Sequence, residues 1–321
     1  MLLLLLGCSG GSPDDTAGPV GLPADFHVGV NYPWHNYGSD FGDNAWGLGG
    51  VADHESAIEA DFAAMADAGV AVVRWFVLTD GRSGIRFDAE GLPAALEDSV
   101  LEDLDAVVTL AEAHGLVLVL SLLDFWWLAE AETVDGVQLG GHAGVIASAQ
   151  GRTALIETVF RPLLVAFGER AGIGAWEVIN EPEWAIEGLG SGWLGDGVSE
   201  AAMVALVDEA VAAIHDETSH PATVGSASIT DAQRLWVAGD LDLIQVHSYD
   251  GAAQITDAAM LSVVPCVVGE LGTASIYGSL SDNLSTLEER GYGGVWLWSL
   301  RGEDEASALD LDAVADWAEG R

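Results

Sequence analysis

The sequence predicts an α/β chain folded as a single (β/α)8 barrel, or TIM barrel. Eight short runs rich in Val, Ile and Leu alternate with eight longer segments whose apolar residues recur three and four positions apart. The short runs are apolar throughout, which indicates parallel strands covered on both faces. The chain has 321 residues and is 50% hydrophobic, enough for one large core. Eight such units favour a closed barrel over an open sheet.

The predicted elements follow one another in strand–helix order. The strands are expected at residues 26–32, 71–78, 116–123, 175–180, 222–228, 243–247, 266–270 and 294–299. The helices are expected at residues 55–68, 96–114, 152–171, 200–216, 231–238, 257–261, 281–290 and 310–319. The helical pattern is weakest in the fifth and sixth of these. No Gly-x-Gly-x-x-Gly motif follows a strand, so a dinucleotide-binding fold has no support.

The connections between these elements are uneven in length. Long segments follow the first, third and fourth strands, at residues 33–54, 125–150 and 182–199. The connections from helix back to strand are short and often contain Gly. Because the loops that follow the strands of such a barrel gather at its C-terminal face, we expect the functional site at that face.

Seven of the eight predicted strands carry a polar or aromatic residue at or near the C-terminal end. These residues are Asn31, Trp34, Arg74, Asp124, Trp126, Trp127, Asn180, Glu181, His247, Tyr249, Glu270, Trp296 and Trp298. Together they predict a polar pocket on top of an apolar barrel. Strand alternation places Val268 and Glu270 on one face. Glu177 is expected to be a structural carboxylate, paired inside or below the barrel.

Two strand ends supply the carboxylates that glycoside hydrolysis requires. Trp176-Glu-Val-Ile-Asn-Glu-Pro182 places Glu181 at one of them, and Cys266-Val-Val-Gly-Glu270 places Glu270 at the other. A retaining mechanism needs one carboxyl group that donates a proton and one carboxylate that attacks the anomeric carbon. Arg74 beside Glu270 would keep that group ionised, and desolvation near Trp184 would keep Glu181 protonated.

The 12 Trp residues are typical of a protein that binds carbohydrate, because sugar rings stack their C–H faces on indole. Seven of them fall at strand ends or in the long loops, where stacking on a sugar and plain packing are equally open: Trp34, Trp46, Trp126, Trp127, Trp184, Trp193 and Trp298. Four others are expected in the core: Trp75, Trp176, Trp236 and Trp317.

The ordered motifs resemble those of clan A glycoside hydrolases. Asn-Glu-Pro lies on the fourth strand, His-x-Tyr on the sixth, Gly-Glu on the seventh and a late Trp on the eighth. Within that clan the chain resembles the cellulase and β-mannanase family, glycoside hydrolase family 5, from residue 26 to the end. The resemblance implies a retaining mechanism on a (β/α)8 barrel, with Glu181 as acid/base and Glu270 as nucleophile.

The same resemblance implies roles for further residues. Asn180 corresponds to the residue that binds the sugar 2-hydroxyl, and Tyr249 to the one that hydrogen-bonds the nucleophile. Arg74 corresponds to the Arg on the second strand near the nucleophile, and His247 to the His on the sixth strand. Trp298, or else Trp296, corresponds to the platform under the cleaved sugar. The third strand departs from the pattern, because many family members have His near its end where this chain has Asp124.

Charge limits the partners that the sequence predicts. Ten basic residues, all Arg, stand against 51 acidic ones, for a net charge of -41. Such a field argues against nucleic acid and disfavours polyanionic substrates. The acidic excess is typical of a solvated shell. No cofactor is expected, and the His residues lack a metal-binding spacing. Asp40, Asp43 and Asp80 could hold Ca²⁺ or a sugar hydroxyl, although loop acids more often face water.

The N-terminus, Met1-Leu-Leu-Leu-Leu-Leu-Gly-Cys8, resembles the end of a bacterial lipoprotein signal peptide. The segment lacks a basic n-region, and its apolar run is shorter than the usual h-region. A translation start upstream of Met1 would account for both departures. The alternative is a stray apolar tail. The resemblance implies lipidation of Cys8, with a membrane-anchored, secreted protein of the bacterial cell envelope. We expect residues 1–8 as the signal segment, 9–25 as a flexible tether and 26–321 as the catalytic barrel. Cys266 is expected to be a buried free thiol.

The sequence therefore predicts a retaining glycosidase that cleaves a neutral β-linked glucan or mannan. One alternative is a surface lipoprotein that binds carbohydrate without catalysis, which the presence of both carboxylates argues against. A second is a transglycosylase, which would use the same Glu181 and Glu270 but exclude water from the acceptor site. Sequence alone leaves endo and exo action equally open.

Overall fold

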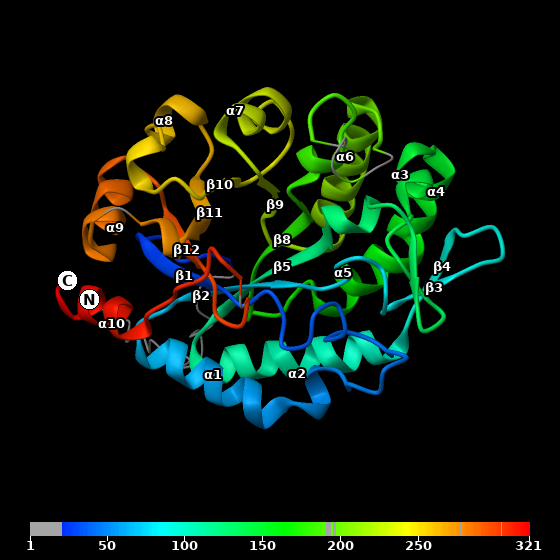
Figure 1. Cartoon of the computed structure of the whole chain (residues 1–321), viewed down its shortest axis with the longest axis horizontal. Coiled ribbons are helices and arrows are strands. Elements are labelled where there is room, and N and C mark those ends of the chain that lie inside the picture. Colours follow the sequence, from blue (N-terminus) through cyan, green and yellow to red (C-terminus); the bar gives the residue numbers. More distant parts are fainter. Residues whose placement is uncertain (1–20, 191–193, 195–196, 277, 303) are drawn as a thin grey trace, which may run out of the picture.

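The computed structural model describes residues 21–190, 194, 197–276, 278–302 and 304–321, and the chain forms a closed barrel (Figure 1). The strands close it in the order β1-β12-β11-β10-β9-β8-β5-β2, with parallel pairing throughout. The barrel strands are β1 (His27–Asn31), β2 (Val72–Phe76), β5 (Val117–Asp124), β8 (Ile173–Asn180), β9 (Ala222–Ser226), β10 (Ile244–Ser248), β11 (Cys266–Gly272) and β12 (Gly294–Trp298). The predicted (β/α)8 fold is confirmed. Cys8 and Trp193 lie outside the described residues.

Helices surround the strands, with α1 and α2 on one side of the barrel and α6, α7 and α8 on the other (Figure 1). The α-helices are α1 (Glu55–Asp67), α2 (Asp98–His114), α3 (Ala143–Ala147), α4 (Ala149–Leu155), α5 (Arg161–Phe167), α6 (Glu200–Glu217), α7 (Ile229–Asp231), α8 (Ala258–Leu261), α9 (Leu280–Glu289) and α10 (Leu311–Glu319). The π-helical turns are η3 (Ile156–Phe160) and η5 (Ala232–Trp236), and the 3-10 turns are η1 (Val51–Asp53), η2 (Phe125–Leu128), η4 (Pro182–Ala185), η6 (Ala252–Gln254) and η7 (Thr273–Ser275).

Two helical predictions need correction. The single helix expected over residues 152–171 is instead α4, the π-helical turn η3 and α5 in direct succession. Inside this turn the hydroxyl of Thr158 donates to the carbonyl of Ala154, a local bond of the kind that disturbs the helical ladder. The helix expected over residues 231–238 is the short α7 continued by the π-helical turn η5.

Two antiparallel hairpins were not predicted. β3 (Ile85–Phe87) pairs with β4 (Pro93–Leu96) after β2, and β6 (Glu132–Val134) pairs with β7 (Val137–Leu139) after β5. Both extend loops that follow barrel strands, and β3 and β4 stand out at the edge of the molecule (Figure 1). The loops at this end of the barrel therefore carry structure of their own.

The inside of the barrel has an apolar lower layer and a polar upper layer. One buried cluster, which only the interior can bring together, consists of residues from five barrel strands and of Leu243, directly before β10: Val72, Val119, Ala175, Leu243, Val267 and Trp296. Two residues further along their strands lie Arg74, Ser121, Glu177 and Gln245, all buried. Because residues two apart share a face of a strand, the polar layer sits directly above the apolar one.

An irregularity in β11 decides that Glu270 faces the interior. The pairing of β11 shifts register between Val268 and Leu271, and in the β10 ladder Glu270 pairs with His247. Val267 belongs to the inner cluster, so strict alternation would point residue 269 inward and Glu270 outward. The prediction that Val268 and Glu270 share a face is therefore wrong, and the bulge turns Glu270 into the barrel. Gly269 fits there because a Cβ would lie 2.3 Å from Gln245.

Several smaller expectations can be checked against the described part of the chain. Trp75, Trp176 and Trp236 are buried as predicted, and Trp317 is partly buried against the core. Cys266 is a buried free thiol, also as predicted. In the residues that the structure describes, no helix combines the length and apolar character needed to cross a membrane.

Candidate active site

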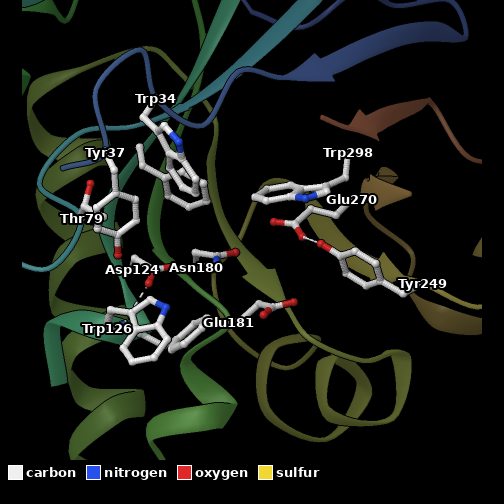
Figure 2. Close-up of a pocket in the computed structure, with 12 residues that line it drawn as sticks. Trp34, Tyr37, Thr79, Asp124, Trp126, Asn180, Glu181, Tyr249, Glu270 and Trp298 are labelled. Atoms are coloured by element: carbon white, nitrogen blue, oxygen red, sulfur yellow. Dashed lines mark hydrogen bonds between the residues drawn. The ribbon is translucent and has the colours of Figure 1, made fainter. Parts of the chain in front are cut away.

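A cavity of about 210 Å³ opens at the C-terminal ends of the barrel strands (Figure 2). Aromatic rings form much of its wall, with carboxyl groups at its base. The lining residues are Trp34, Tyr37, Phe76, Thr79, Asp124, Phe125, Trp126, Asn180, Glu181, Tyr249, Glu270 and Trp298. The predicted pocket at this face of the barrel is therefore present, and both predicted catalytic carboxylates reach it.

Glu181 follows the last residue of β8 in a left-handed conformation, with φ 43° and ψ 50°. Such a conformation is uncommon for a residue with a Cβ and persists only where neighbours hold it. Here Glu183 anchors the following turn: its Oε1 accepts hydrogen bonds from Ser226 and from the indole of Trp236, at 2.6 and 2.7 Å. The turn η4 therefore fixes the carboxylate of Glu181 over the cavity.

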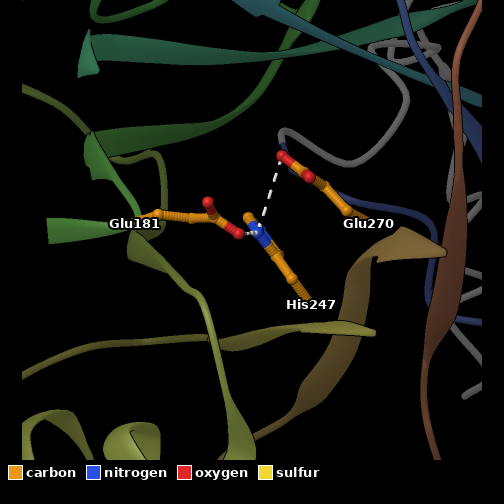
Figure 3. A group of neighbouring side chains, drawn as sticks. All are labelled: Glu181, His247 and Glu270. Carbon is orange, nitrogen blue, oxygen red and sulfur yellow. Dashed lines mark hydrogen bonds and ion pairs between the residues drawn. The ribbon is translucent and has the colours of Figure 1, made fainter. Parts of the chain in front are cut away.

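The two catalytic carboxylates face each other. One oxygen of Glu181, one oxygen of Glu270 and a ring nitrogen of His247 all lie within 4.8 Å of one another (Figure 3). Carboxyl groups about 5–5.5 Å apart are typical of retaining glycosidases, whereas inverting enzymes leave about 6.5–9.5 Å for a water molecule. The separation therefore supports retention of configuration.

Arg74 links the buried acids beneath the cavity. Its guanidinium donates to both oxygens of Glu177 at 2.6 Å and to Oε1 of Glu270 at 2.7 Å. It also donates to the side-chain oxygens of Asn31 and Asn180. Arg74 and Glu177 are fully buried, so Glu177 is the structural, paired carboxylate that the sequence predicts. Burial favours the neutral form of Glu177, yet the charge and hydrogen bonds of Arg74 hold its pKa below the ordinary value.

The surroundings of Glu181 and Glu270 suit opposite roles. Burial raises the pKa of Glu181 to about 7, against the opposing hydrogen bond from the indole of Trp184, so the carboxyl can hold a proton near neutral pH. Burial also raises the pKa of Glu270, while Arg74 and the hydroxyl of Tyr249 oppose that rise. Arg74 lies beside Glu270 as expected and favours its ionised form, but burial outweighs this effect. Glu270 nevertheless has a charged donor, which favours the carboxylate, whereas Glu181 has neutral donors.

His247 lies between the two carboxylates (Figure 3). Its Nδ1 is 2.8 Å from Oε1 of Glu181, and its Nε2 is 3.3 Å from the side-chain nitrogen of Gln245. Since that amide nitrogen can only donate, Nε2 accepts, and the proton sits on Nδ1 and points to Glu181. Burial lowers the pKa of His247, which fits this neutral ring.

Several predicted substrate-binding residues lie outside the cavity wall. The side chains of Asn31, Arg74 and His247 are buried beneath the catalytic carboxylates, because their polar groups hold one another and the acids. Trp127 is fully buried, with its ring 4.5 Å from that of His142. The prediction that Asn31, Arg74, His247 and Trp127 contact the sugar is therefore corrected: these four side chains support the site from outside the cavity wall. Trp184 is exposed but outside the lining, and its indole donates to Oε2 of Glu181 at 2.9 Å.

The remaining predicted residues line the cavity, together with four that were not predicted to bind substrate: Tyr37, Phe76, Thr79 and Phe125. Phe125 directly follows the predicted Asp124, and Phe76 is the last residue of β2. Their position at strand ends could therefore have identified Phe125 and Phe76 as residues of the cavity wall. Tyr37 comes from the long loop after β1, where no pattern distinguishes it from its neighbours.

Glu181, His247 and Glu270 are also close enough to share a metal ion. Their polar atoms already have partners, since Glu270 accepts from Arg74 and Tyr249, and His247 bonds Glu181. Hydrogen bonding therefore accounts for the cluster. Two of the three loop acids weighed as Ca²⁺ ligands are also engaged: Asp40 accepts from two backbone N–H groups and Trp75, and Asp80 pairs with Arg82. The third, Asp43, is exposed.

Comparison with known proteins adds evidence independent of this geometry. No family model matches the chain. A mannan endo-1,4-β-mannosidase from Mytilus edulis is 24% identical over 317 residues, which cover 85% of this chain and 83% of that protein. The crystal structure of a β-1,4-D-mannanase from Cryptopygus antarcticus matches with a TM-score of 0.77 at 19% identity, over 92% of this chain and 91% of that chain. A broad-specificity endoglucanase from an uncultured bacterium matches with a TM-score of 0.61 at 14% identity, over 93% and 95%.

The closed barrel, the facing carboxylates and these matches indicate that the chain is a glycosidase, and its ordered strand-end motifs resemble those of clan A. Within that clan it resembles the cellulase and β-mannanase family, as its strand-end motifs predict, and it is homologous to mannan endo-1,4-β-mannosidases. The predicted fold, family resemblance and enzyme class are confirmed.

Proposed function

We propose that the protein hydrolyses a β-1,4-linked mannan with retention of configuration. The separation of the two carboxylates carries the proposal, because it suits direct attack on the anomeric carbon. Mannan is favoured over other neutral polysaccharides because the relatives from Mytilus edulis and Cryptopygus antarcticus are mannan endo-1,4-β-mannosidases. A net charge of -41 also suits an uncharged substrate.

In the first step a carboxylate oxygen of Glu270 attacks the anomeric carbon, and the bond from that carbon to the glycosidic oxygen breaks. Glu181 gives its proton to the departing oxygen, and a glycosyl ester forms on Glu270. In the second step Glu181 takes a proton from water, whose oxygen attacks the same carbon. The ester bond breaks, the sugar leaves with its original configuration, and Glu270 is ionised again.

The aromatic walls of the cavity suit the sugar ring. Trp34, Trp126 and Trp298 line the cavity, and Trp298 lies beside Glu270 (Figure 2). The indole N–H of Trp298 donates to Asp304 at 2.7 Å, which fixes the ring plane. We assign Trp298 as the platform under the sugar being cleaved and Tyr249 as the residue that orients Glu270, because its hydroxyl donates to that carboxylate.

The test is hydrolysis of purified polysaccharides and aryl glycosides. We expect activity on β-mannan, with a product whose first-formed anomer, followed by ¹H NMR, is β. Glu270→Ala and Glu181→Ala should each lower kcat by about 10³-fold or more, because each removes a group that acts in the transition state. Azide should partly rescue both variants on activated aryl glycosides. Glu59→Ala, which alters an exposed carboxylate on α1, is the control.

Three results would contradict this proposal. Wild-type rates in either catalytic variant would remove its carboxylate from the mechanism. An α-anomer as the first product would show inversion. Activity confined to β-glucans would keep the mechanism but replace mannan as the substrate.

We also propose that the chain is a secreted lipoprotein held on a bacterial envelope through Cys8. The run of Leu that closes on Leu-Gly-Cys supports this, as does the Gly-, Ser- and Pro-rich composition of residues 9–25. Expression of the full chain in a bacterium with and without Cys8→Ala, followed by fractionation, tests the anchor. Wild-type protein that stays out of the membrane fraction would contradict it.

A further inference from the structure

Asp124 stands at the end of β5, beside the sugar-facing amide of Asn180, and has no part in the two proton transfers. Its Oδ2 accepts a hydrogen bond from Nδ2 of Asn180 at 2.7 Å, and its Oδ1 accepts one from the backbone N–H of Trp126 at 2.9 Å. Both Asp124 and Asn180 are buried apart from the face that lines the cavity. Figure 2 shows the pair at the base of the pocket.

The amide of Asn180 is held in one orientation by its two neighbours. Arg74 has only donors, and it gives a hydrogen to Oδ1 of Asn180 at 2.7 Å. Oδ2 of Asp124 receives a hydrogen from Nδ2. Rotating the amide by a half-turn would set its N–H donors against those of Arg74. Arg74 and Asp124 together therefore fix a nitrogen, and not an oxygen, on the Asp124 side of the Asn180 amide.

The fixed amide and carboxylate leave one donor and one acceptor for a ligand. The amide nitrogen has two hydrogens, and the bonds of the described residues use one of them. Each oxygen of Asp124 takes one hydrogen bond from the described residues, so lone pairs remain. A hydroxyl group is the ligand that matches such a pair, because its oxygen can accept from Asn180 while its hydrogen is donated to Asp124.

Geometry indicates which hydroxyl this is. Asn180 and Glu270 receive hydrogens from the two terminal nitrogens of the same guanidinium, so the amide lies beside the nucleophile. The anomeric carbon that Glu270 attacks has the ring oxygen and C2 as neighbours. The ring oxygen loses electron density in the oxocarbenium-like transition state and becomes a poor acceptor. The hydroxyl on C2 is then the group that Asn180 and Asp124 can bind.

We propose that Asp124 is a specificity-determining residue that distinguishes the two configurations of the sugar at C2. It does so by orienting Asn180 and by accepting a hydrogen bond from the C2 hydroxyl. This inference rests on the proposed glycosidase function. Mannose and glucose differ only at C2, where the hydroxyl is axial or equatorial. Asn180 and Asp124 hold each other in place. Inverting C2 moves the hydroxyl oxygen away from both residues, so they discriminate between mannosides and glucosides.

The test uses three aryl glycosides: 4-nitrophenyl β-mannoside, 4-nitrophenyl β-glucoside and their common 2-deoxy analogue. We expect Asp124→Ala to lower kcat/KM for the preferred glycoside by about 10- to 100-fold, the effect of losing a hydrogen bond to a charged group. For the 2-deoxy analogue the loss should stay below about 3-fold. The mannoside-to-glucoside ratio should move toward one. For Asp124→Asn, kcat/KM should lie between the values of the wild type and Asp124→Ala, because the single side-chain oxygen of Asn cannot accept from both Asn180 and Trp126.

Glu183→Gln is the matched control, because Glu183 is another buried carboxylate that receives N–H and O–H donors but lies outside the cavity wall. It should change all three rates by one common factor. If Asp124→Ala also lowers all three rates by one factor and leaves the ratio unchanged, the inference is overturned and the glycosidase function stands. If the wild-type protein hydrolyses no β-glycoside or β-glycan, the proposed function fails, and the inference fails with it.

Discussion

Replacing Glu181 by Gln should remove the loss of stability that this group causes at high pH, and it should also remove activity. In the folded protein the pKa of Glu181 is raised from 4.5 to about 7, with burial as the main cause. Between these pH values the unfolded chain has lost the proton and the folded protein still holds it, so this group makes stability fall as pH rises. The rise corresponds to about 3 kcal/mol at about 1.36 kcal/mol per pKa unit. Above pH 7 the whole penalty is present, and below pH 4.5 it is absent.

Gln does not titrate, but its amide nitrogen cannot accept one of the two N–H donors, from His247 and Trp184, that the oxygens of Glu181 accept. That cost is the same at every pH, so the stability of Glu181→Gln relative to the wild type should rise by about 3 kcal/mol between pH 4 and pH 8. For a chain of this size the rise corresponds to a change of about 5 °C in the Tm difference between the two proteins. Urea unfolding of both proteins from pH 4 to 8.5 measures the difference, in which the other titrating groups largely cancel.

Glu59→Gln supplies the control, because Glu59 is exposed on α1 and its replacement should shift stability by less than about 0.5 kcal/mol at any pH. The reasoning fails if the difference between Glu181→Gln and the wild type is independent of pH. It also fails if the variant loses stability relative to the wild type as the pH rises. Either result would mean that Glu181 is already ionised in the folded protein near pH 5 and could not act as the acid.

Two further predictions concern the partners of the catalytic acids. Trp184→Phe removes an N–H that lowers the pKa of Glu181, so the alkaline limb of the kcat/KM profile on a phenyl β-glycoside should move up by about 0.5–1 pH unit; a limb that moves down would contradict the assignment. Arg74→Met should lower the free energy of unfolding, measured in urea, by about 3–5 kcal/mol, because Glu177 and Glu270 lose their buried cation. A loss below about 1 kcal/mol would show that these carboxyl groups do not depend on Arg74.

The barrel and its catalytic pair could be predicted because both depend on local patterns. Continuous apolar runs such as residues 116–123 have one stable environment, a strand buried on both faces, and strand ends such as Asn180-Glu181 necessarily meet at the mouth of the barrel. Glu177 was placed correctly because it is a lone acid in the middle of such a run. These inferences needed only periodicity and the geometry of parallel strands.

The parts that could not be predicted depend on contacts between distant segments. The face on which Glu270 lies depends on a bulge, which forms because Gly269 allows close approach to Gln245 from the neighbouring strand. Burial of Trp127 depends on packing against His142, which follows the β6–β7 hairpin. The hairpin itself had a local signal, since Asp135-Gly136 connects its strands with positive φ at both residues.

The charge balance beneath the cavity explains why a proton is held where catalysis needs one. Of the four carboxyl groups Asp124, Glu177, Glu181 and Glu270, only Glu177 and Glu270 accept hydrogen bonds from the guanidinium of Arg74. Burial raises the pKa of Asp124 and of Glu181 to about 7, and it also raises the pKa of Glu270, where Arg74 opposes the rise. Once Glu270 is esterified its charge is gone, and like-charge repulsion on Glu181 falls. The pKa of Glu181 then drops, so the group that gave the proton in the first step can take one from water in the second.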